Sequence, residues 1–390
     1  MKIAMMVRGY MTAPKPADII YAPIDLAVII ARGLASRGHE VTFFAPTGSS
    51  IDGVTIRSLD IRPLVNNQTE FSKLVHNIDW LTHYVPQLWD VKLATAMFDC
   101  AELGEYDLLY FHHPEIALPL AVKHLDVPVA YTLNDPLDGW YRQAFEMFHS
   151  PNQHLISISN NQRRGAPDLP FAQTVYNGVD TKLWEFSEEH EDYLIIAGRI
   201  VPEKGFREAI KIAQQTNHRL LIIGPTYEDH QNYFDDYIKP YLNDKILYLG
   251  SMDQAQLAKY YQKAKAFLMP VQWEEPFGQT MVEAMSCGTP VIALRRGSVP
   301  EIIVDGKTGF IRDSISEMAE AVGQIDSIKR RDCRKHVEQH FSAETMVDGY
   351  EKTFKDILLF NKQTTPPSRL VKSRLKRLPH KIKSRLKKLK

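Results

Sequence analysis

Short apolar runs alternate with amphipathic segments along the first third of the chain. Runs rich in aliphatic and aromatic residues predict strands over residues 3–7, 41–44, 107–111 and 127–132. Segments 26–37 and 116–124 carry apolar side chains three and four positions apart, which predicts helices. Aliphatic strands that alternate with helices are typical of a parallel sheet covered on both faces.

The same alternation begins again after a polar, acidic stretch at residues 185–192. Strands are predicted over residues 193–197, 219–223, 246–249, 266–270 and 290–294, and helices over 206–216, 254–264 and 279–287. The repeated order predicts an α/β fold of two tandem Rossmann-like doubly wound domains. Such sheets bind ligands at the carboxyl ends of their strands, so the site is expected in a cleft where the two domains face each other.

We place the first domain at residues 1–185 and the second at residues 186–341. A last helical pattern covers 342–361. As a crossover helix it would brace the first domain, although the sequence leaves its direction open.

Composition narrows the class of protein. The chain of 390 residues is 44% hydrophobic and 24% charged, with 20 Gly and 23 Pro, which excludes collagenous, disordered and disulfide-scaffold proteins. Cys100, Cys287 and Cys333 lack metal-ligand spacing and are interpreted as buried small hydrophobic residues in a reducing compartment. The sequence contains neither a secretory apolar region nor a membrane-spanning run, so we expect a cytoplasmic protein.

The formal net charge of zero conceals an asymmetry. Residues 362–390 hold 12 of the 47 Lys and Arg and none of the 47 Asp and Glu, so the rest of the chain has a net charge of −12. An acidic body disfavours nucleic-acid binding. The tail has apolar residues at helical spacing, interrupted by Pro379, and two interpretations stay open: contact with an anionic membrane surface, or docking on the acidic body. RNA binding is a distant third.

Two loops in the second half carry the candidate chemistry. Arg199 and Lys204 lie in a glycine-bounded loop between a predicted strand and a predicted helix, where two cations would bracket a diphosphate. Glu275 and Glu283 stand eight residues apart around the start of another predicted helix, whose free N–H groups favour an anion. Neither predicted domain has a dinucleotide or P-loop glycine motif.

Several motifs together make the chain resemble glycosyltransferase family 4, the retaining nucleotide-sugar transferases of the GT-B type. The resemblance covers roughly residues 1–360 and is clearer in the second domain. Its motifs are Tyr176-Asn-Gly-Val-Asp180, Gly198-Arg-x4-Lys-Gly205, Glu275-Pro-Phe-Gly-x4-Glu283, Ala284-Met-Ser-Cys-Gly-Thr-Pro290, Gly297-Ser-Val-Pro-Glu301 and Asp305-Gly-Lys-Thr-Gly-Phe310.

The resemblance implies a role for each matching residue. Arg199 and Lys204 match the pair that holds the donor diphosphate and stabilises the departing nucleoside diphosphate. Glu275 matches the residue that binds sugar hydroxyls, and Glu283 the carboxylate on the nucleotide ribose. It further implies front-face transfer through an oxocarbenium-like state, with no cofactor and no metal.

Other residues complete the implied site. The backbone amides of Phe277, Gly278 and Gln279 would approach phosphate or sugar oxygens. His112 matches the histidine near the transferred sugar, although His113 could take that part.

One stretch departs from the family pattern. In the stretch Tyr21-Ala-Pro-Ile-Asp25, Ala22-Pro23 stands where the family often has two glycines, and Pro23 has no N–H to donate to a phosphate. Either another amide, from residues 8–10, contacts the diphosphate, or the acceptor side is reshaped. Gln279 and Thr280 also replace aliphatic residues common in the family.

The expected function is transfer of a sugar, from a UDP-sugar as the commonest donor, to an acceptor hydroxyl in cell-surface glycan or glycolipid synthesis. The acceptor would be a small molecule, a glycan or a lipid-linked compound, with the tail at the inner face of the membrane. The alternatives are an epimerase, a sugar-phosphate synthase, or a catalytically silent protein that binds a sugar nucleotide. The Pro23 departure is the one feature that supports the silent protein.

Overall fold

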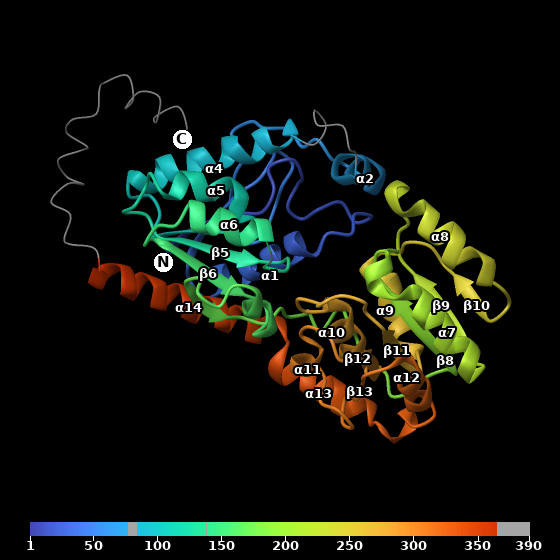
Figure 1. Ribbon diagram of the computed structural model, residues 1–390. Helices are drawn as coiled ribbons and strands as arrows, with labels where there is room; N and C mark the ends of the chain where they lie inside the picture. Colours follow the sequence, from blue (N-terminus) through green and yellow to red (C-terminus); the bar gives the residue numbers. More distant parts are fainter. Residues whose placement is uncertain (77–83, 138, 365–390) are drawn as a thin grey trace.

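The computed structural model describes residues 1–76, 84–137 and 139–364. These residues form two α/β domains, each built on a wholly parallel sheet (Figure 1). The predicted fold class, two tandem doubly wound domains, is therefore confirmed. Strands 193–197 and 219–223 and helix 206–216 lie as the sequence pattern predicts, to the residue.

The first sheet has seven strands. Their order is β3 (Thr55–Arg57), β2 (Glu40–Phe44), β1 (Lys2–Met6), β4 (Leu108–Phe111), β5 (Val129–Leu133), β6 (Gln153–Ser157) and β7 (Phe171–Thr174). Its described helices are α1 (Ala22–Ser36), α2 (Gln68–His76), α4 (Gln87–Glu102), α5 (Pro114–Ala121) and α6 (Gly139–Met147). Helix α1 packs on one face of the sheet, and α4, α5 and α6 cover the other, with a separate apolar core on each side.

The second sheet has six strands. Their order is β10 (Ile246–Tyr248), β9 (Arg219–Ile223), β8 (Tyr193–Ala197), β11 (Ala266–Met269), β12 (Val291–Leu294) and β13 (Gly309–Arg312). Its helices are α7 (Phe206–Thr216), α8 (Gln231–Tyr237), α9 (Gln254–Lys263), α10 (Gln279–Ser286), α11 (Val299–Ile302), α12 (Ile315–Val322) and α13 (Arg330–His340). Helix α7 packs with α12, whereas α10 packs with α9 and α13.

The last helix, α14 (Ala343–Thr364), returns to the first domain and lies along it beside α1 (Figure 1). Tyr350 and Phe354 are fully buried in the first domain's core, and the Thr132 Oγ1 atom is 2.8 Å from the Tyr350 hydroxyl. The direction that the sequence left open is thus toward the first domain.

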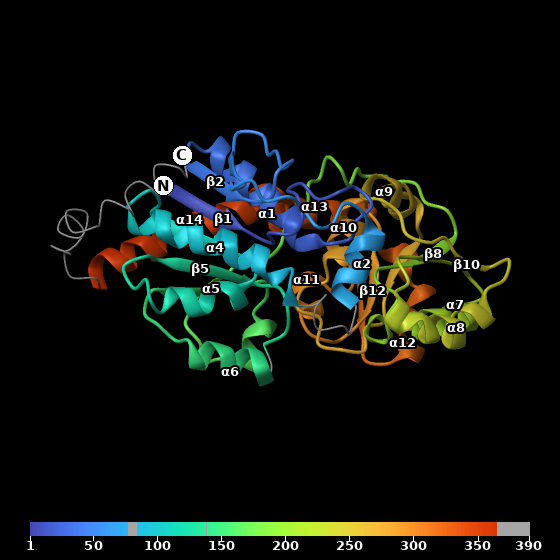
Figure 2. The same ribbon diagram turned by 90° about the horizontal axis from the view of Figure 1, so that it is seen from above.

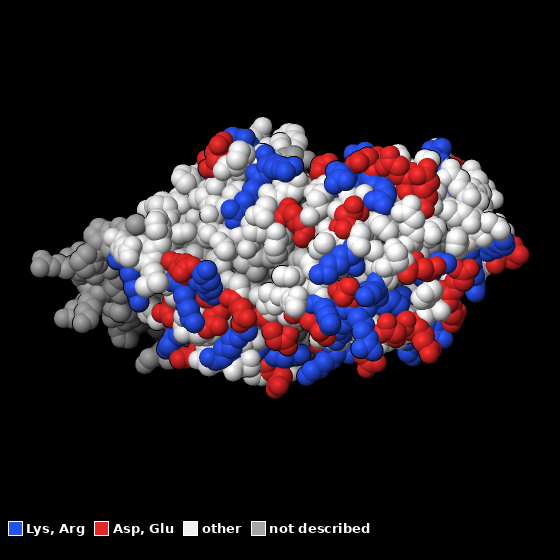
Figure 3. Space-filling model, turned by 90° about the horizontal axis from the view of Figure 1, so that it is seen from below, with Lys and Arg blue, Asp and Glu red and all other residues white. Residues whose placement is uncertain are grey.

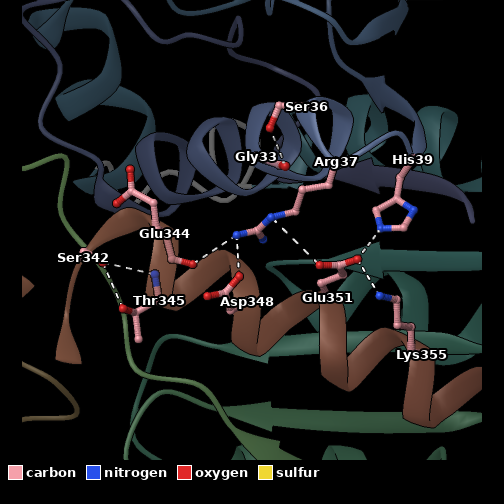
Figure 4. A network of polar contacts seen from close by, with 10 residues as sticks. All are labelled: Gly33, Ser36, Arg37, His39, Ser342, Glu344, Thr345, Asp348, Glu351 and Lys355. Carbon is pink, nitrogen blue, oxygen red and sulfur yellow. Dashed lines mark hydrogen bonds and ion pairs between the residues drawn. The ribbon is translucent and has the colours of Figure 1, made fainter. Parts of the chain in front are cut away.

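Charged side chains border the contact between α1 and α14 (Figure 4). The Arg37 guanidinium donates to Asp348 at 2.5 Å, and Glu351 pairs with His39 at 2.9 Å and with Lys355 at 2.6 Å. Hydrogen bonds from Lys355 and His39 lower the pKa of Glu351 to about 2. Asp348 and Lys355 are exposed, so their pairs contribute little to stability. The His39–Glu351 pair is largely shielded from water and adds to the attachment made by the buried aromatic side chains.

Gly178 packs against the backbone at Ser342, where the chain passes from the second domain into α14. A Cβ atom at Gly178 would lie 2.4 Å from the Ser342 carbonyl oxygen, and this backbone cannot move aside cheaply. We expect Gly178→Ala to lower the free energy of unfolding by about 1–3 kcal/mol because of this overpacking. Gly323→Ala is the matched control, since the nearest atom to its Cβ is 3.5 Å away. Equal denaturation midpoints for the two variants would contradict the prediction.

The two domains lie side by side, and α2 of the first approaches the second in both ribbon views (Figure 2). On the face in Figure 3, basic and acidic side chains are interspersed. A nucleic-acid footprint needs one sign of charge over a continuous surface, and this face mixes both. No helix in the described part of the chain is both long and apolar enough to cross a bilayer. The three cysteines are free thiols and buried, as the sequence predicts.

Candidate functional site

The strand order of each sheet locates the candidate site. In the first sheet the order reverses between β1 and β4, and in the second between β8 and β11. Ligands of open α/β sheets bind at such switch points, outside the carboxyl ends of the strands. Arg8 and His112 follow β1 and β4, while Arg199 follows β8 and Glu275 follows β11. Sequence-predicted residues from both domains therefore lie at the two switch points.

Lys204 and Glu275 are in direct contact. The Lys204 Nζ atom is 2.6 Å from Glu275 Oε2, and the Trp273 indole N–H donates to the same oxygen at 2.9 Å. The Lys204 ammonium also lies 5.0 Å from the centre of the Trp273 ring. Glu275 is buried, so this arrangement places one cation and one carboxylate together on a partly desolvated surface. A fixed pair of this kind can bind a phosphate and a sugar hydroxyl side by side.

Two glycines allow the site loops to pack closely. A Cβ atom at Gly205 would lie 2.0 Å from the Pro270 carbonyl oxygen, and one at Gly297 would lie 2.3 Å from the backbone N and O of Glu275. Both residues have positive φ, +75° and +57°, which L side chains rarely adopt. The backbone thereby holds the Lys204 loop and the Glu275 loop against each other.

Arg199 is exposed, and no acidic group within the described ranges comes close enough to form an ion pair with it. It nevertheless acts across the domain boundary on Asp135, which follows β5 of the first domain. Burial raises the pKa of Asp135, and the charge of Arg199 opposes that rise. The unpaired guanidinium is therefore available to an anion between the two sheets.

Glu283 lies on the buried face of α10. Burial and the nearby carboxylate of Asp25 raise its pKa to about 8. Asp25 belongs to the first turn of α1 and also accepts a 3.4 Å hydrogen bond from Gln254 of the second domain. Glu283 itself has no ion-pair partner in the described part of the chain, so its carboxyl group is free to accept hydroxyl hydrogen bonds from a ligand between the domains.

This raised pKa has a consequence for stability. Between pH 4.5 and about 8 the unfolded chain has lost a proton that folded Glu283 still holds, so stability falls as pH rises through this range. We expect Glu283→Gln to flatten this part of the curve of melting temperature against pH. Glu320→Gln, at an exposed position, is the control and should follow the wild type. An unchanged slope in Glu283→Gln would contradict the assignment.

The start of α10 leaves backbone donors open. Gly278 is its N-cap with φ +81°, and in the described part of the chain the amides of Phe277, Gly278 and Gln279 donate no hydrogen bond. The Phe277 ring packs against Tyr176 and Phe341 in the core of the second domain. The Gln279 side chain donates to the Gly178 carbonyl at 3.3 Å, and its buried Oε1 atom has no partner. These amides can receive an anion.

His112 and His113 have different surroundings. His112 is 2% exposed, neither ring nitrogen has a partner among the described residues, and burial lowers its pKa to about 3. A buried imidazole without a partner is uncommon, so His112 keeps hydrogen-bonding capacity that the described residues do not use. His113 instead contacts Arg8 at 2.9 Å and the Tyr21 hydroxyl. Both nitrogens of the His113 ring are thus engaged, whereas those of His112 are shielded from solvent and unpaired within the described ranges.

The network behind His113 was missed by the sequence reasoning. The Arg8 guanidinium donates to Asp90 at 3.0 Å, and Asp90 is fully buried on α4. Asp90 also accepts from the Gly9 amide, so that amide is not available to a phosphate. The sequence held two separate signals. Asp90 is an acidic residue on the apolar face of a helix, and Arg8 is a cation close after a strand.

Glu301 links the two domains. Its carboxylate accepts from the backbone N–H of Asn160 and Asn161, at 2.8 and 2.7 Å, and from the Tyr176 hydroxyl at 2.8 Å. The sequence included Glu301 in a motif without assigning it a role. No group of three His, Cys, Asp or Glu in the described ranges is placed to hold a metal ion, and the expectation of a metal-free reaction stays a prediction.

Comparisons with known proteins give a family for each half of the chain. Residues 26–183 match the family model described as Glycosyltransferase Family 4, and residues 181–340 match the model described as Glycosyl transferases group 1. N-acetyl-alpha-D-glucosaminyl L-malate synthase of Bacillus anthracis is 24% identical over 367 residues, which are 84% of this chain and 92% of that protein.

Solved structures share the fold. Sucrose-phosphate synthase of Thermosynechococcus elongatus superposes with a TM-score of 0.71 at 16% identity, covering 92% of this chain and all of that one. HepE of Anabaena, solved in complex with UDP, has a TM-score of 0.67 at 18% identity, with coverage of 91% and 100%. At these identities the likeness concerns the fold alone.

Proposed function

We propose that this chain, which belongs to glycosyltransferase family 4, transfers a sugar from a UDP-sugar to an acceptor hydroxyl with retention of the anomeric configuration. The observation that carries the proposal is the contact of Lys204 with Glu275, beside the open amides at the start of α10. A cation, a carboxylate and free N–H groups together match the phosphate and hydroxyl groups of a sugar nucleotide. HepE, with the same fold, was solved with UDP and with UDP-glucose, which supports the choice of base.

Each side chain has a task in this scheme. Lys204 and Arg199 bind the diphosphate and stabilise the charge that develops on it as the glycosidic bond breaks. Glu275 accepts hydrogen bonds from sugar hydroxyls, and Glu283 accepts from the ribose. His112 meets the transferred sugar from the first domain. A leaving phosphate oxygen removes the acceptor proton, so the reaction needs neither a carboxylate nucleophile nor a metal.

The experiment is a screen of nucleotide sugars for donor hydrolysis, read by NMR so that the anomer released first is identified. We expect a UDP-sugar to be hydrolysed with its configuration retained. An inverted product would overturn retention, and a different nucleotide would overturn the choice of donor. Tight binding of a donor with no turnover would favour the catalytically silent protein, while epimerised or phosphorylated sugar products would favour the other enzymes.

The basic tail suggests where the reaction occurs. Residues 365–390 lie outside the described residues, and the proposal for them rests on their sequence. We place the enzyme at the cytoplasmic face of the membrane, in cell-surface glycan or glycolipid synthesis, with the tail on anionic lipid. Deletion of residues 362–390 should abolish sedimentation with phosphatidylglycerol vesicles while transfer to a soluble acceptor continues. Full-length protein that ignores such vesicles would contradict this placement.

A further inference from the structure

A pocket on the first domain has no role in the donor site. Its volume is about 350 Å³, within the range of small-molecule sites. One wall is the loop before α2 and the other is the first two turns of α4. The lining residues are Ile61, Arg62, Pro63, Leu64, Leu88, Trp89 and Lys92.

The pocket lies directly behind the network that holds His113. The Trp89 backbone packs closely on Gly9. A Cβ atom added at Gly9 would lie 2.7 Å from the Trp89 carbonyl carbon. The next residue, Asp90, binds Arg8, which in turn contacts His113. On the other wall, the Leu64 amide donates to the Tyr10 carbonyl at 2.9 Å. A ligand in the pocket would thus sit one layer of residues from the first domain's switch point.

The walls are apolar and the rim is cationic. Leu88 is 60% exposed, which leaves a large apolar side chain in water at the pocket mouth. Trp89 donates its indole N–H to the Arg62 carbonyl at 3.0 Å, which fixes the ring in the wall. The charged groups of Arg62 and Lys92 form no ion pair within the described ranges. Apolar surface beside unpaired cations complements an amphiphile with an anionic head.

We propose that this pocket is an acceptor subsite that binds the hydrocarbon chain and the phosphate of a lipid-linked acceptor. The role in transfer rests on the proposed function, whereas the binding itself does not. Charge complementarity argues for this occupant: Arg62 and Lys92 attract a phosphate. The same two cations disfavour the chain's own tail, which carries 12 Lys and Arg and no acidic residue over 362–390.

The test is calorimetric titration of the full-length protein with decyl phosphate below its critical micelle concentration. Wild-type protein should bind it saturably and more tightly than decyl maltoside, which has the same chain and an uncharged head. Leu88→Asp should weaken binding about tenfold or more, since an apolar contact is lost and a negative charge is added. Leu359→Asp is the matched control, because Leu359 is 57% exposed on α14, and it should bind as the wild type does.

The cations are tested separately. The double variant Arg62→Gln/Lys92→Gln should lose the preference for decyl phosphate over decyl maltoside and keep the binding of the uncharged amphiphile. The proposal is overturned if wild-type protein shows no saturable binding, if Leu88→Asp binds like Leu359→Asp, or if the double variant keeps the preference. It is also overturned if Leu88→Asp turns a dimer into a monomer or speeds tryptic cleavage of the tail, since a second copy or the tail would then fill the pocket.

Activity separates this inference from the proposed function. Donor hydrolysis should be unchanged in Leu88→Asp, while KM for a lipid-phosphate-linked acceptor rises about tenfold or more. Hydrolysis with no binding of decyl phosphate would overturn the pocket alone. Binding of decyl phosphate with no turnover of any nucleotide sugar would overturn the transferase and with it the acceptor role.

Discussion

Lys204→Ala is expected to lower the rate of sugar transfer about 10²-fold or more. The substitution removes the ammonium group that lies 2.6 Å from Glu275 and that would stabilise the leaving diphosphate. Since this charge matters most in the transition state, the loss should appear in kcat more than in KM. Steady-state donor hydrolysis and transfer, measured with the donor found in the screen, provide both constants.

A change of fold must be separated from a change of chemistry. Lys211→Ala on α7 is the matched control, because this lysine forms only a 3.9 Å surface pair with Glu208. Its kcat should equal that of the wild type. Lys204→Arg keeps the charge and should recover part of the rate. Wild-type turnover in Lys204→Ala would remove Lys204 from the reaction, and a matching loss in Lys211→Ala would indicate a general structural effect.

Asp90→Ala is expected to lower the free energy of unfolding by about 3–5 kcal/mol. Asp90 is fully buried, and its carboxylate pairs with Arg8 and accepts from the Gly9 amide. Burial raises the pKa of Asp90, and the Arg8 charge opposes the rise. Without Asp90 the guanidinium stays in the protein with no carboxylate beside it. Urea denaturation at neutral pH measures the loss.

An exposed pair offers the comparison. Glu146 on α6 pairs with Arg142 at 2.8 Å, but its side chain is 55% exposed. Glu146→Ala should cost less than about 1 kcal/mol, since water replaces most of this interaction. Asp90→Asn, which retains an oxygen for the Gly9 amide, should be intermediate. Similar losses in the two alanine variants would mean that burial adds nothing to the contribution of the Arg8–Asp90 pair to stability.

The sequence predicted the elements whose pattern is locally complete. Strands such as β8 and β9 are continuous aliphatic runs, and α7 repeats its apolar positions at helical spacing. Strand β6 was not predicted because Gln153 and His154 interrupt its apolar pattern, although all five residues are buried. His154 is satisfied by Asn361 of α14 at 2.9 Å, a partner 207 positions away in the chain. A strand stabilised in this way cannot be recognised from its own residues.

The residues of the candidate site also fall into those that the sequence identified and those that it missed. The loops that hold Arg199, Lys204, Glu275 and Glu283 were identified because their residue types and spacing are compact motifs. Arg8 and Asp90 were missed because no short segment contains both, and their pairing depends on where α4 packs. The resemblance suggested His112 and left His113 open, and only the hydrogen bonds distinguish the two rings.

By itself, then, the amino-acid sequence determined the α/β class, the two-domain order and the chemical character of the donor loops. These properties follow from periodicity and residue type within short stretches of chain. Only the tertiary structure decided that α14 returns to the first domain, that Lys204 lies on Glu275, and that an apolar pocket with a cationic rim lies behind His113. Such contacts join segments far apart in the chain, and packing alone determines which of them meet.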